Sequence, residues 1–309
     1  SPAPPLLRPS APLLHITGVH LWNLPLVWDL LRRGVPVVHT LHDLNPHYGR
    51  RFGSLIRLWN RLLVRSGCHL LVHGQCYRHQ LLQRGLPPER VTYTPLLHLF
   101  LGHRSLRSVA ALADDVRHEP WALFFGRLQR YKGLDTLLQA QALLRRSGAD
   151  PRLTLAGPGS LDPIWDGPLP PGVDLRAGLI DDVLAVDLFR RCGLLVLPYR
   201  DATQSALIGA AYYFRKPVIV TAVGALPEYV EPGRTGWVVP PSDPASLART
   251  LADALSNQER LARMGEAARA WYDRQRLGEW ETLVRMYRRQ ADTLRSNRPA
   301  GRAEGPHAA

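Results

Sequence analysis

The stretch FFGRLQRYKGLDTLLQA, Phe124–Ala140, decides the fold, because it places a strand, a loop and a helix in direct succession. An apolar run ends at Gly126, the loop carries Arg127 and Lys132, and a helical pattern begins near Gly133. A basic pair between the end of a strand and the start of a helix can bind an anion, since free N–H groups and the helix dipole add to the two cations. The alternative is a pair of solvated loop cations. That alternative is weakened because the whole chain of 309 residues contains only two lysines.

Short apolar strands alternate with helices of 10 to 15 residues on both sides of this stretch. Strands are predicted over residues 13–17, 36–41, 70–73, 91–94, 122–125, 153–156, 194–197, 218–221 and 236–239. Helices are predicted over residues 22–33, 55–65, 76–84, 134–145, 183–191, 204–214, 245–255, 259–272 and 280–294. This alternation is typical of parallel sheets built from βαβ units, so the fold class is α/β.

The pattern runs in two series, and it predicts two doubly wound domains with a ligand site between them or at the carboxyl ends of their strands. The predicted division is a first domain at 1–105, a linker at 106–120, a second domain at 121–278, a closing helix at 279–295 and a disordered tail at 296–309.

The charge of the chain is strongly positive, with 39 basic and 26 acidic residues and a net charge of +13. Residues 1–105 hold twelve arginines and only three carboxylates, so the basic character lies in the first third. The arginines lack interleaved aromatic side chains and any nucleic-acid-binding motif, which argues against a nucleic-acid partner. Five of them recur on or beside one predicted helix: Arg50, Arg51, Arg57, Arg61 and Arg65. A solvated face is the ordinary explanation, and a contact with an anionic membrane surface is the alternative.

Cysteine and histidine usage argues against a disulfide scaffold or a metal site. Three cysteines give no paired framework and no zinc-type spacing, which favours a reducing, cytoplasmic compartment, with a peripheral place at the inner face of the membrane as an option. His39 and His42 point to opposite faces of a strand, and no cluster of carboxylates or cysteines completes a ligand set. His73, Cys76 and His79 share one predicted helical face but lack an orienting third group for nucleophilic catalysis.

The stretch GRLQRYKGLDTLLQA resembles the signature of the retaining GT-B glycosyltransferases of group 1, family 4. The resemblance implies two Rossmann-like domains facing a cleft, with Arg127 and Lys132 binding the diphosphate of a nucleotide-sugar donor. It continues through LTLAGPGS at 153–160 and almost without interruption over 188–255. The segment 280–289 is similar to the terminal helix that crosses back to the first domain. Donor-side residues implied by the resemblance are Gly126, Arg127, Lys132, Gly157, Gly159, Ile180, Thr203, Gln204, Ser205, Gly224 and Glu228.

One departure from the family pattern concerns two carboxylates that the family usually carries with seven residues between them. Alanines, Ala202 and Ala210, occupy these positions here. The loop Thr203–Ser205 resembles that of a sub-branch that lacks the pair, in which these residues and the N–H groups at the helix start receive sugar hydroxyls and phosphate. An ordinary helix N-cap is the alternative for Thr203. For Glu228, the alternative to donor binding is a local cap or ion pair.

The first third resembles the acceptor-side domain of the family less specifically. The strand and loop PVVHTLHDLNPHYG bring His42, Asp43 and His47 to the acceptor side, where His42 would contact the donor sugar or orient the acceptor. A structural histidine bonded to a loop carbonyl is the alternative. Only about a dozen residues precede the first strand, so we expect the N-terminal domain to be truncated relative to the family.

The resemblance therefore implies a retaining, metal-independent transfer of a sugar from a nucleotide diphosphate sugar to a hydroxyl acceptor, either a glycan or a lipid-linked one, without a cofactor. His42, Arg127 and Lys132 would be the catalytic residues. The competing hypothesis is a non-catalytic GT-B binding or partner subunit, or an inactive fragment of a longer enzyme, and both the absent carboxylates and the short first domain favour it.

Overall fold

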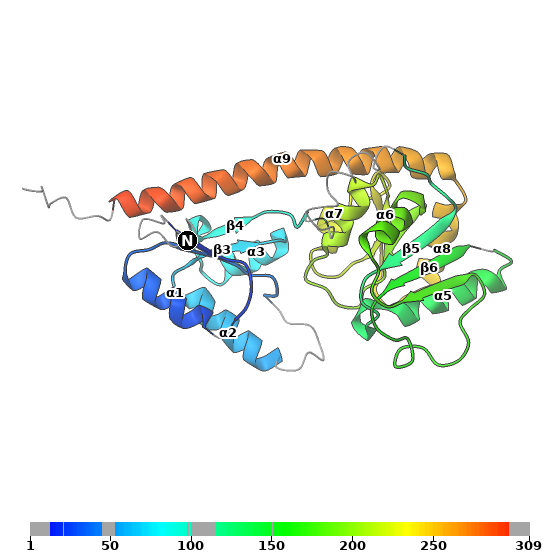
Figure 1. The fold of residues 1–309 in the computed structure, drawn as a ribbon, viewed down its shortest axis with the longest axis horizontal. Helices are drawn as coiled ribbons and strands as arrows, with labels where there is room; N and C mark the ends of the chain where they lie inside the picture. The colour runs from blue at the N-terminus through cyan, green and yellow to red at the C-terminus, as the bar shows by residue number, and fades with distance from the viewer. Residues whose placement is uncertain are drawn as a thin grey trace, which may run out of the picture.

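The computed structural model describes residues 13–20, 22–44, 53–97, 99, 115–149 and 151–296. They form two parallel β-sheets, each with helices packed against it, and one long helix runs along both (Figure 1). The α/β class and the two-domain arrangement predicted from the alternating pattern are confirmed.

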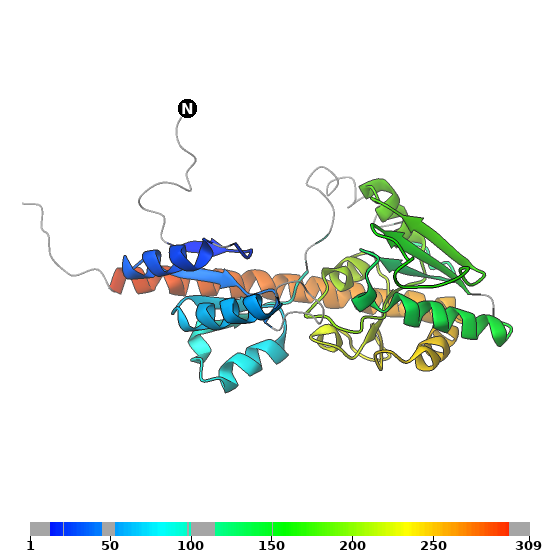
Figure 2. The same cartoon turned by 90° about the horizontal axis from the view of Figure 1, so that it is seen from below.

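The first domain contains a four-stranded parallel sheet of order β1-β2-β3-β4. Its strands are β1 (Leu14–Ile16), β2 (Val37–Thr40), β3 (His69–Val72) and β4 (Val91–Tyr93). They are connected by α1 (Asn23–Arg32), α2 (Gly53–Arg65) and α3 (Gln75–Gln83), with a short 3₁₀ turn, η2 (Pro88–Arg90), before β4. Because all three crossovers advance in the same direction, right-handed connections place the three helices on one face of the sheet, as Figure 2 shows from below.

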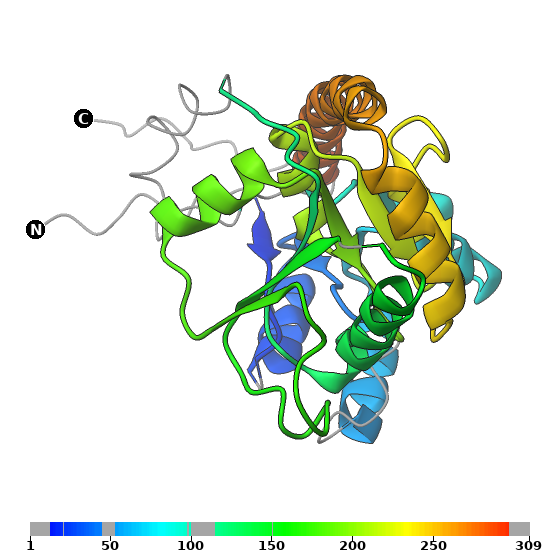
Figure 3. The same ribbon diagram turned by 90° about the vertical axis from the view of Figure 1, so that its right-hand side faces the viewer.

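The second domain contains a six-stranded parallel sheet of order β10-β9-β8-β5-β6-β7. Its strands are β5 (Trp121–Phe125), β6 (Arg152–Gly157), β7 (Val173–Ala177), β8 (Leu194–Leu197), β9 (Val218–Thr221) and β10 (Gly236–Val239). Its helices are α5 (Leu134–Arg146), α6 (Asp182–Arg191), α7 (Ala206–Tyr213) and α8 (Pro244–Leu255), with 3₁₀ turns η3 (Arg130–Lys132) and η4 (Leu226–Tyr229). Figure 3 looks toward this domain along the length of the molecule. The chain leaves β5 toward β6 and β7 and returns to β8 on the other side, so the topological switch point lies between β5 and β8.

The final helix, α9 (Gln258–Ser296), is a single element of 39 residues that packs on both domains (Figure 1). In the first domain, Met286 packs with Val38 and Leu71, on the sheet face opposite α1 to α3. The hydroxyl of Tyr287 lies 2.6 Å from Nδ1 of His15, and Gln290 lies 3.1 Å from Nδ1 of His69. The helix therefore holds the two sheets in one assembly.

Several predicted boundaries differ from the structure. Two separate helices were predicted at 259–272 and 280–294, but the polar segment between them continues the helix, and the predicted domain boundary at 278 falls inside α9. Glu279 in that segment is buried, and its carboxylate accepts a hydrogen bond of 2.6 Å from Arg276, three residues earlier. This pair stabilises the helix across the polar segment. The predicted linker at 106–120 is described only from residue 115, and the tail beyond 296 lies outside the described residues.

Candidate functional site

The loops that follow the strands of both sheets carry the predicted site residues, and they meet where the two domains contact each other. Lys132, in η3 after β5, donates a hydrogen bond of 2.9 Å to the hydroxyl of Tyr199, which follows β8. Its Nζ also lies 4.6 Å from the centre of the Tyr199 ring. Lys132 therefore spans the switch point of the sheet, the position where open α/β sheets bind ligands.

Backbone segments approach closely around this lysine. A Cβ atom on Gly133, where φ is +67°, would lie 1.9 Å from the carbonyl oxygen of Pro198. A Cβ atom on Gly157 would lie 2.1 Å from the carbonyl oxygen of Gly126. Glycine at these two positions lets the ends of β5, β6 and β8 pack directly against each other, which leaves the Lys132 side chain at their shared edge.

The other residues predicted from the glycine-rich loops lie along the same edge. Arg127 is exposed in the loop between Gly126 and η3. The next residue, Leu128, forms an isolated parallel bridge with Gly159, so the loops after β5 and β6 run side by side. Ile180 is half-buried after the edge strand β7, which is two strands away from β5, so the structure places it apart from Lys132 along the sheet edge.

The loop Thr203–Ser205 leads into α7. Ser205, not Thr203, is the N-cap residue of this helix, and its side chain makes no capping bond. The alternative of an N-cap role for Thr203 is therefore wrong. Thr203 instead donates a hydrogen bond of 3.0 Å to the carboxylate of Asp43 in the first domain. Oε1 of Gln204 is buried without a hydrogen-bond partner, an unusual state for a buried acceptor.

The positions of the two absent carboxylates are both apolar and buried. Ala202 lies in the loop before α7 and Ala210 lies within that helix. A Cβ atom on Gly224, where φ is +51°, would lie 1.8 Å from the carbonyl oxygen of Ala202. The predicted donor loops at 202–205 and 224–228 are thus in direct backbone contact, an arrangement reinforced by the hydrogen bond of 3.0 Å from Ala225 N–H to the Thr203 carbonyl.

Glu228, in η4, contacts the other domain. Its two carboxylate oxygens accept hydrogen bonds of 2.5 and 2.7 Å from the backbone N–H groups of Gln75 and Cys76. These residues begin α3, so Glu228 caps a helix of the first domain rather than a neighbour in sequence. The adjacent Tyr229 donates a hydrogen bond of 2.5 Å to the His73 carbonyl. It also accepts one of 2.8 Å from Leu96 N–H, so its hydroxyl is a second link between the domains.

The first-domain residues lie after β2. His42 is half-buried, and its Nε2 lies 2.9 Å from the Thr17 carbonyl oxygen, which is the structural contact foreseen as the alternative. Donation from Nε2 leaves Nδ1 as the hydrogen-bond acceptor of the ring. The imidazole of His73, which follows β3, lies 5.4 Å away, centre to centre. Asp43 is bonded to Thr203, while His47 lies outside the described residues.

Cysteine chemistry is not supported at this edge. Burial, together with the hydrogen bond and charge of Glu228, raises the pKa of Cys76 to about 12, so the group is a thiol at neutral pH. Within the part of the chain that the structure describes, no group of three or more His, Cys, Asp or Glu side chains could hold a metal ion. The charged side chains at this edge include the two cations Arg127 and Lys132 and the partnered carboxylates Asp43 and Glu228.

Sequence reasoning gave no role in the site to Tyr199 and Tyr229, and it placed His73 on one helical face with Cys76 and His79. His73 in fact precedes α3 and lies in the loop after β3. Tyr199 orients Lys132, Tyr229 bridges the domains, and His73 lies beside His42. Tyr199 and His73 follow strands β8 and β3, which is the one signal that the sequence offered for them, whereas Tyr229 ends the turn η4. Their contacts are with residues far away in the sequence, so no local motif could have revealed them.

The fold and the site together define a GT-B arrangement, in which two Rossmann-like domains meet at the carboxyl ends of their parallel strands. The model for Glycosyl transferases group 1 matches residues 119–257, and the model for the Glycosyl transferase 4-like domain matches residues 6–96. The chain belongs to the group 1 glycosyltransferases.

Curated relatives carry glycosyltransferase names. A D-inositol 3-phosphate glycosyltransferase of Streptomyces scabiei is 34% identical over 273 residues, which covers 77% of this chain and 59% of the relative. An alpha-D-kanosaminyltransferase of Streptomyces kanamyceticus is 26% identical over 261 residues, covering 76% of this chain and 65% of the relative. The chain therefore spans about three fifths of the length of these relatives.

Solved structures share the fold. Sucrose-phosphate synthase from Thermosynechococcus elongatus has a TM-score of 0.67 at 23% identity, covering 93% of this chain and 74% of that one. Anabaena HepE in complex with UDP has a TM-score of 0.65 at 18% identity, covering 91% and 78%. At these identities the likeness establishes the two-domain architecture.

Proposed function

We propose that this protein transfers a sugar from a nucleotide diphosphate sugar to a hydroxyl acceptor, a glycan or a lipid-linked one, with retention at the anomeric carbon. The observation that carries the proposal is the placement of Lys132 across the switch point between β5 and β8, held by Tyr199. Family membership and the relatives named above, all of them glycosyltransferases, support the class of reaction.

The two cations supply the electrostatic part of the mechanism. When the bond to the leaving diphosphate breaks, negative charge grows on its terminal oxygens. Lys132 is held in place before the donor arrives, and the exposed Arg127 lies on the same loop. Fixed cations at this point lower the energy of the transition state more than that of the bound donor, and the resemblance implies that no metal is needed.

Polar groups from both domains position the sugar and the acceptor. The buried, unpartnered Oε1 of Gln204 can accept a hydrogen bond from a sugar hydroxyl. Free N–H groups at the start of α7 point toward the same loop. His42 reaches the site from the first domain, beside Asp43. In retaining enzymes of this type the leaving phosphate is thought to take the acceptor's proton, and accordingly no side chain is assigned as the base.

A second candidate is a GT-B partner subunit without catalysis, favoured by the alanines at 202 and 210. Ala210 is fully buried, so α7 presents no carboxylate to a donor ribose there. Such a subunit would retain nucleotide binding through Lys132 and lose turnover.

A thermal-shift series with UDP-, GDP- and ADP-sugars tests the donor site. The wild-type chain is compared with the Arg127→Ala/Lys132→Ala double variant and with Arg146→Ala, an exposed arginine on α5. We expect stabilisation of wild type and of Arg146→Ala by at least one donor and none of the double variant. Stabilisation by no donor would refute the donor site. Release of nucleotide diphosphate on adding acceptors then separates the enzyme from the partner subunit.

A further inference from the structure

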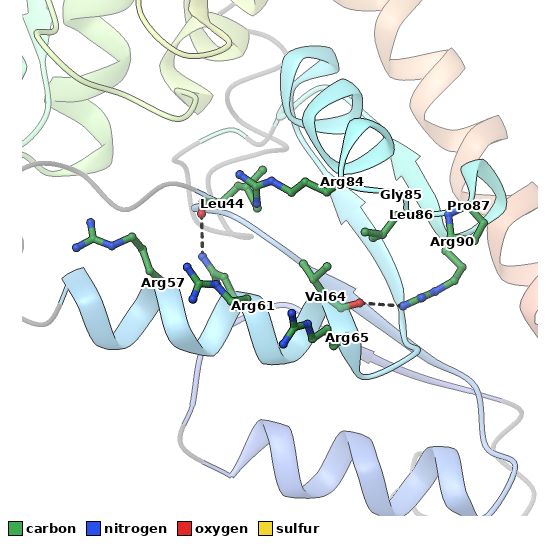
Figure 4. A pocket seen from close by; sticks show the side chains of 11 residues that line it. Leu44, Arg57, Arg61, Val64, Arg65, Arg84, Gly85, Leu86, Pro87 and Arg90 are labelled. Atoms are coloured by element: carbon green, nitrogen blue, oxygen red, sulfur yellow. Dashed lines mark hydrogen bonds between the residues drawn. The ribbon is translucent and has the colours of Figure 1, made fainter.

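A groove lined by arginines lies between α2 and the turn that follows α3, in the first domain. It has a volume of about 570 Å³ (Figure 4). One wall carries Arg57, Arg61 and Arg65 of α2, and the other carries Arg84 and Arg90. The remaining lining residues are Leu44, Asn60, Val64, Gly85, Leu86 and Pro87. Among the described residues, no carboxylate lines this groove.

The arginines of α2 share one side of the helix because they recur every fourth residue. Figure 4 shows them on the side of α2 that faces Arg84. Within the described residues, none of Arg57, Arg61, Arg65 and Arg84 forms an ion pair, so their charges repel one another across the groove without compensation. All four arginines are exposed, and together they form a concentration of positive charge that attracts anions.

Arg90 has a different role within the same groove. Its Nη2 donates hydrogen bonds of 3.2 and 3.1 Å to the carbonyls of Val64 and Cys68 and so fixes the end of α2 against β3. Its Nε is buried and has no hydrogen-bond acceptor. Arg90 therefore adds positive charge to the groove lining and, through its hydrogen bonds, also holds the base of the groove together.

Exposed apolar side chains flank the arginines. On the helical wheel of α2, Leu58 and Leu55 follow directly beside the arginine row, and they are 49% and 55% exposed. Trp28 of α1 is also exposed and lines a second hollow together with Ser66, just after α2. Trp22, at the start of α1, is 71% exposed. A row of arginines beside a row of leucines, with tryptophans nearby, is typical of surfaces that lie in the interface of an anionic membrane.

We propose that this groove is a second anion site, distinct from the donor site, and that it binds the phosphate groups of anionic phospholipids while Leu55, Leu58 and the α1 tryptophans enter the interface. The proposal does not depend on sugar transfer, because the groove lies on the helix-covered face of the first sheet and contains neither Arg127 nor Lys132. Its Leu44 end is one residue from Asp43, which places a bound membrane next to the acceptor side of the site.

Sedimentation with vesicles tests the proposal. The full chain is mixed with vesicles of phosphatidylcholine alone and of phosphatidylcholine with 30 mol% phosphatidylglycerol, a composition of about one anionic lipid in three. Wild type is compared with Arg57→Gln/Arg61→Gln/Arg84→Gln and with a charge-matched control, Arg146→Gln/Arg249→Gln/Arg263→Gln, whose exposed arginines lie on α5, α8 and α9 of the opposite half. Arg90 is left unchanged because its hydrogen bonds to the carbonyls of Val64 and Cys68 stabilise the fold. A fourth variant, Leu55→Ser/Leu58→Ser, keeps the charge and removes the apolar row.

We expect binding to the anionic vesicles only, a loss of roughly tenfold or more in the groove variant, and a loss of at most about twofold in the matched control. The leucine variant should also bind several-fold less. Equal loss in both arginine variants would show a non-specific charge effect and overturn the proposal, as would no binding by wild type. Inorganic phosphate and pyrophosphate at millimolar concentration should compete weakly. Abolition of vesicle binding by them, with the leucine variant unaffected, would identify a soluble phosphate ligand and overturn the lipid assignment.

Discussion

Oε2 of Glu228 lies 2.5 Å from the backbone nitrogen of Gln75, although 153 residues separate the two in the chain. The bond joins η4 of the second domain to the first turn of α3 in the first. A carboxylate at a helix N-terminus satisfies free N–H groups and interacts favourably with the helix dipole. Glu228 was predicted as a donor-site residue, and that role stays a prediction. The contact shows that the same side chain also joins the domains.

Replacing Glu228 with alanine should lower the free energy of unfolding by about 1 kcal/mol, because two backbone N–H groups lose their acceptor at an exposed position. Glu228→Gln keeps one acceptor oxygen and should cost about half as much. Urea titration measures both. A donor role would add a loss of nucleotide-sugar affinity in Glu228→Ala that exceeds the effect on stability, whereas a purely structural role would leave the affinity within about twofold.

Gly133→Ala should destabilise the protein by about 3 kcal/mol or more. The substitution adds left-handed backbone strain and also places a methyl group 1.9 Å from the Pro198 carbonyl oxygen. Gly148→Ala is the matched control, because φ there is +84° and nothing lies within 4 Å of the new atom. The control should lose about 1 kcal/mol from strain alone. Equal midpoints in chemical denaturation would mean that the β5 and β8 ends do not pack as described.

Tyr199→Phe should weaken nucleotide diphosphate binding about threefold to tenfold. The variant retains the ring beneath Lys132 but removes the 2.9 Å hydrogen bond that fixes its ammonium group. Isothermal titration calorimetry is performed with a nucleoside diphosphate and with the matching nucleoside. A loss of affinity for the diphosphate alone would be attributed to Lys132, because the nucleoside has no phosphate to contact the lysine. The control is Tyr272→Phe in α9, distant from the site. Unchanged diphosphate affinity in Tyr199→Phe would remove the tyrosine from the site.

Acid should destabilise the first domain between pH 6.5 and 4. Burial lowers the pKa of His39 and of His69 to about 4, with Arg289 and Arg90 adding to the effect on His69. The unfolded chain therefore binds more protons than the folded one in this window, and stability falls as the pH falls. Each histidine contributes up to about 1.4 kcal/mol per pH unit.

His39→Gln provides the test of this pH dependence. Denaturation at pH 7 and at pH 5 should show a smaller difference between the two pH values than in wild type, by about 1 to 2 kcal/mol, because glutamine does not titrate. An unchanged difference would show that the His39 imidazole is not held neutral. His79, on α3, is an exposed histidine and serves as the control.

Much of the architecture follows from short-range patterns. Strand β8 is a run of four buried apolar residues. The loop from Gly126 to Gly133 begins and ends with glycines that have positive φ. Both features can be recognised from the sequence alone. Strand β7 was missed because it is an edge strand. Val173–Ala177 contains no fully buried residue and alternates with charged side chains, so it lacks an apolar run.

The candidate site was only partly predictable for a related reason. Arg127 and Lys132 belong to one local motif, whereas the Thr203–Asp43 bond spans 160 residues and the Glu228 cap spans 153. Such contacts depend on how two sheets are placed relative to each other. That placement is set by α9 and the domain contacts, and no periodicity within either domain encodes it.

The substitution Gln204→Met should lower the affinity for the nucleotide sugar without lowering the stability of the fold. Oε1 of Gln204 is buried with no hydrogen-bond donor, a state that costs free energy. Its removal should therefore leave the free energy of unfolding unchanged or raise it by up to about 1 kcal/mol. Affinity for the nucleotide sugar should fall about threefold to tenfold, while affinity for the nucleotide diphosphate should stay within about twofold. Gln141→Met is the control: this buried glutamine of α5 donates to Pro151 and Pro171, so its loss should lower stability without changing binding. A Gln204→Met variant that loses stability and keeps its sugar affinity would make Gln204 a structural residue, and the loop before α7 would then contact the donor through its backbone alone.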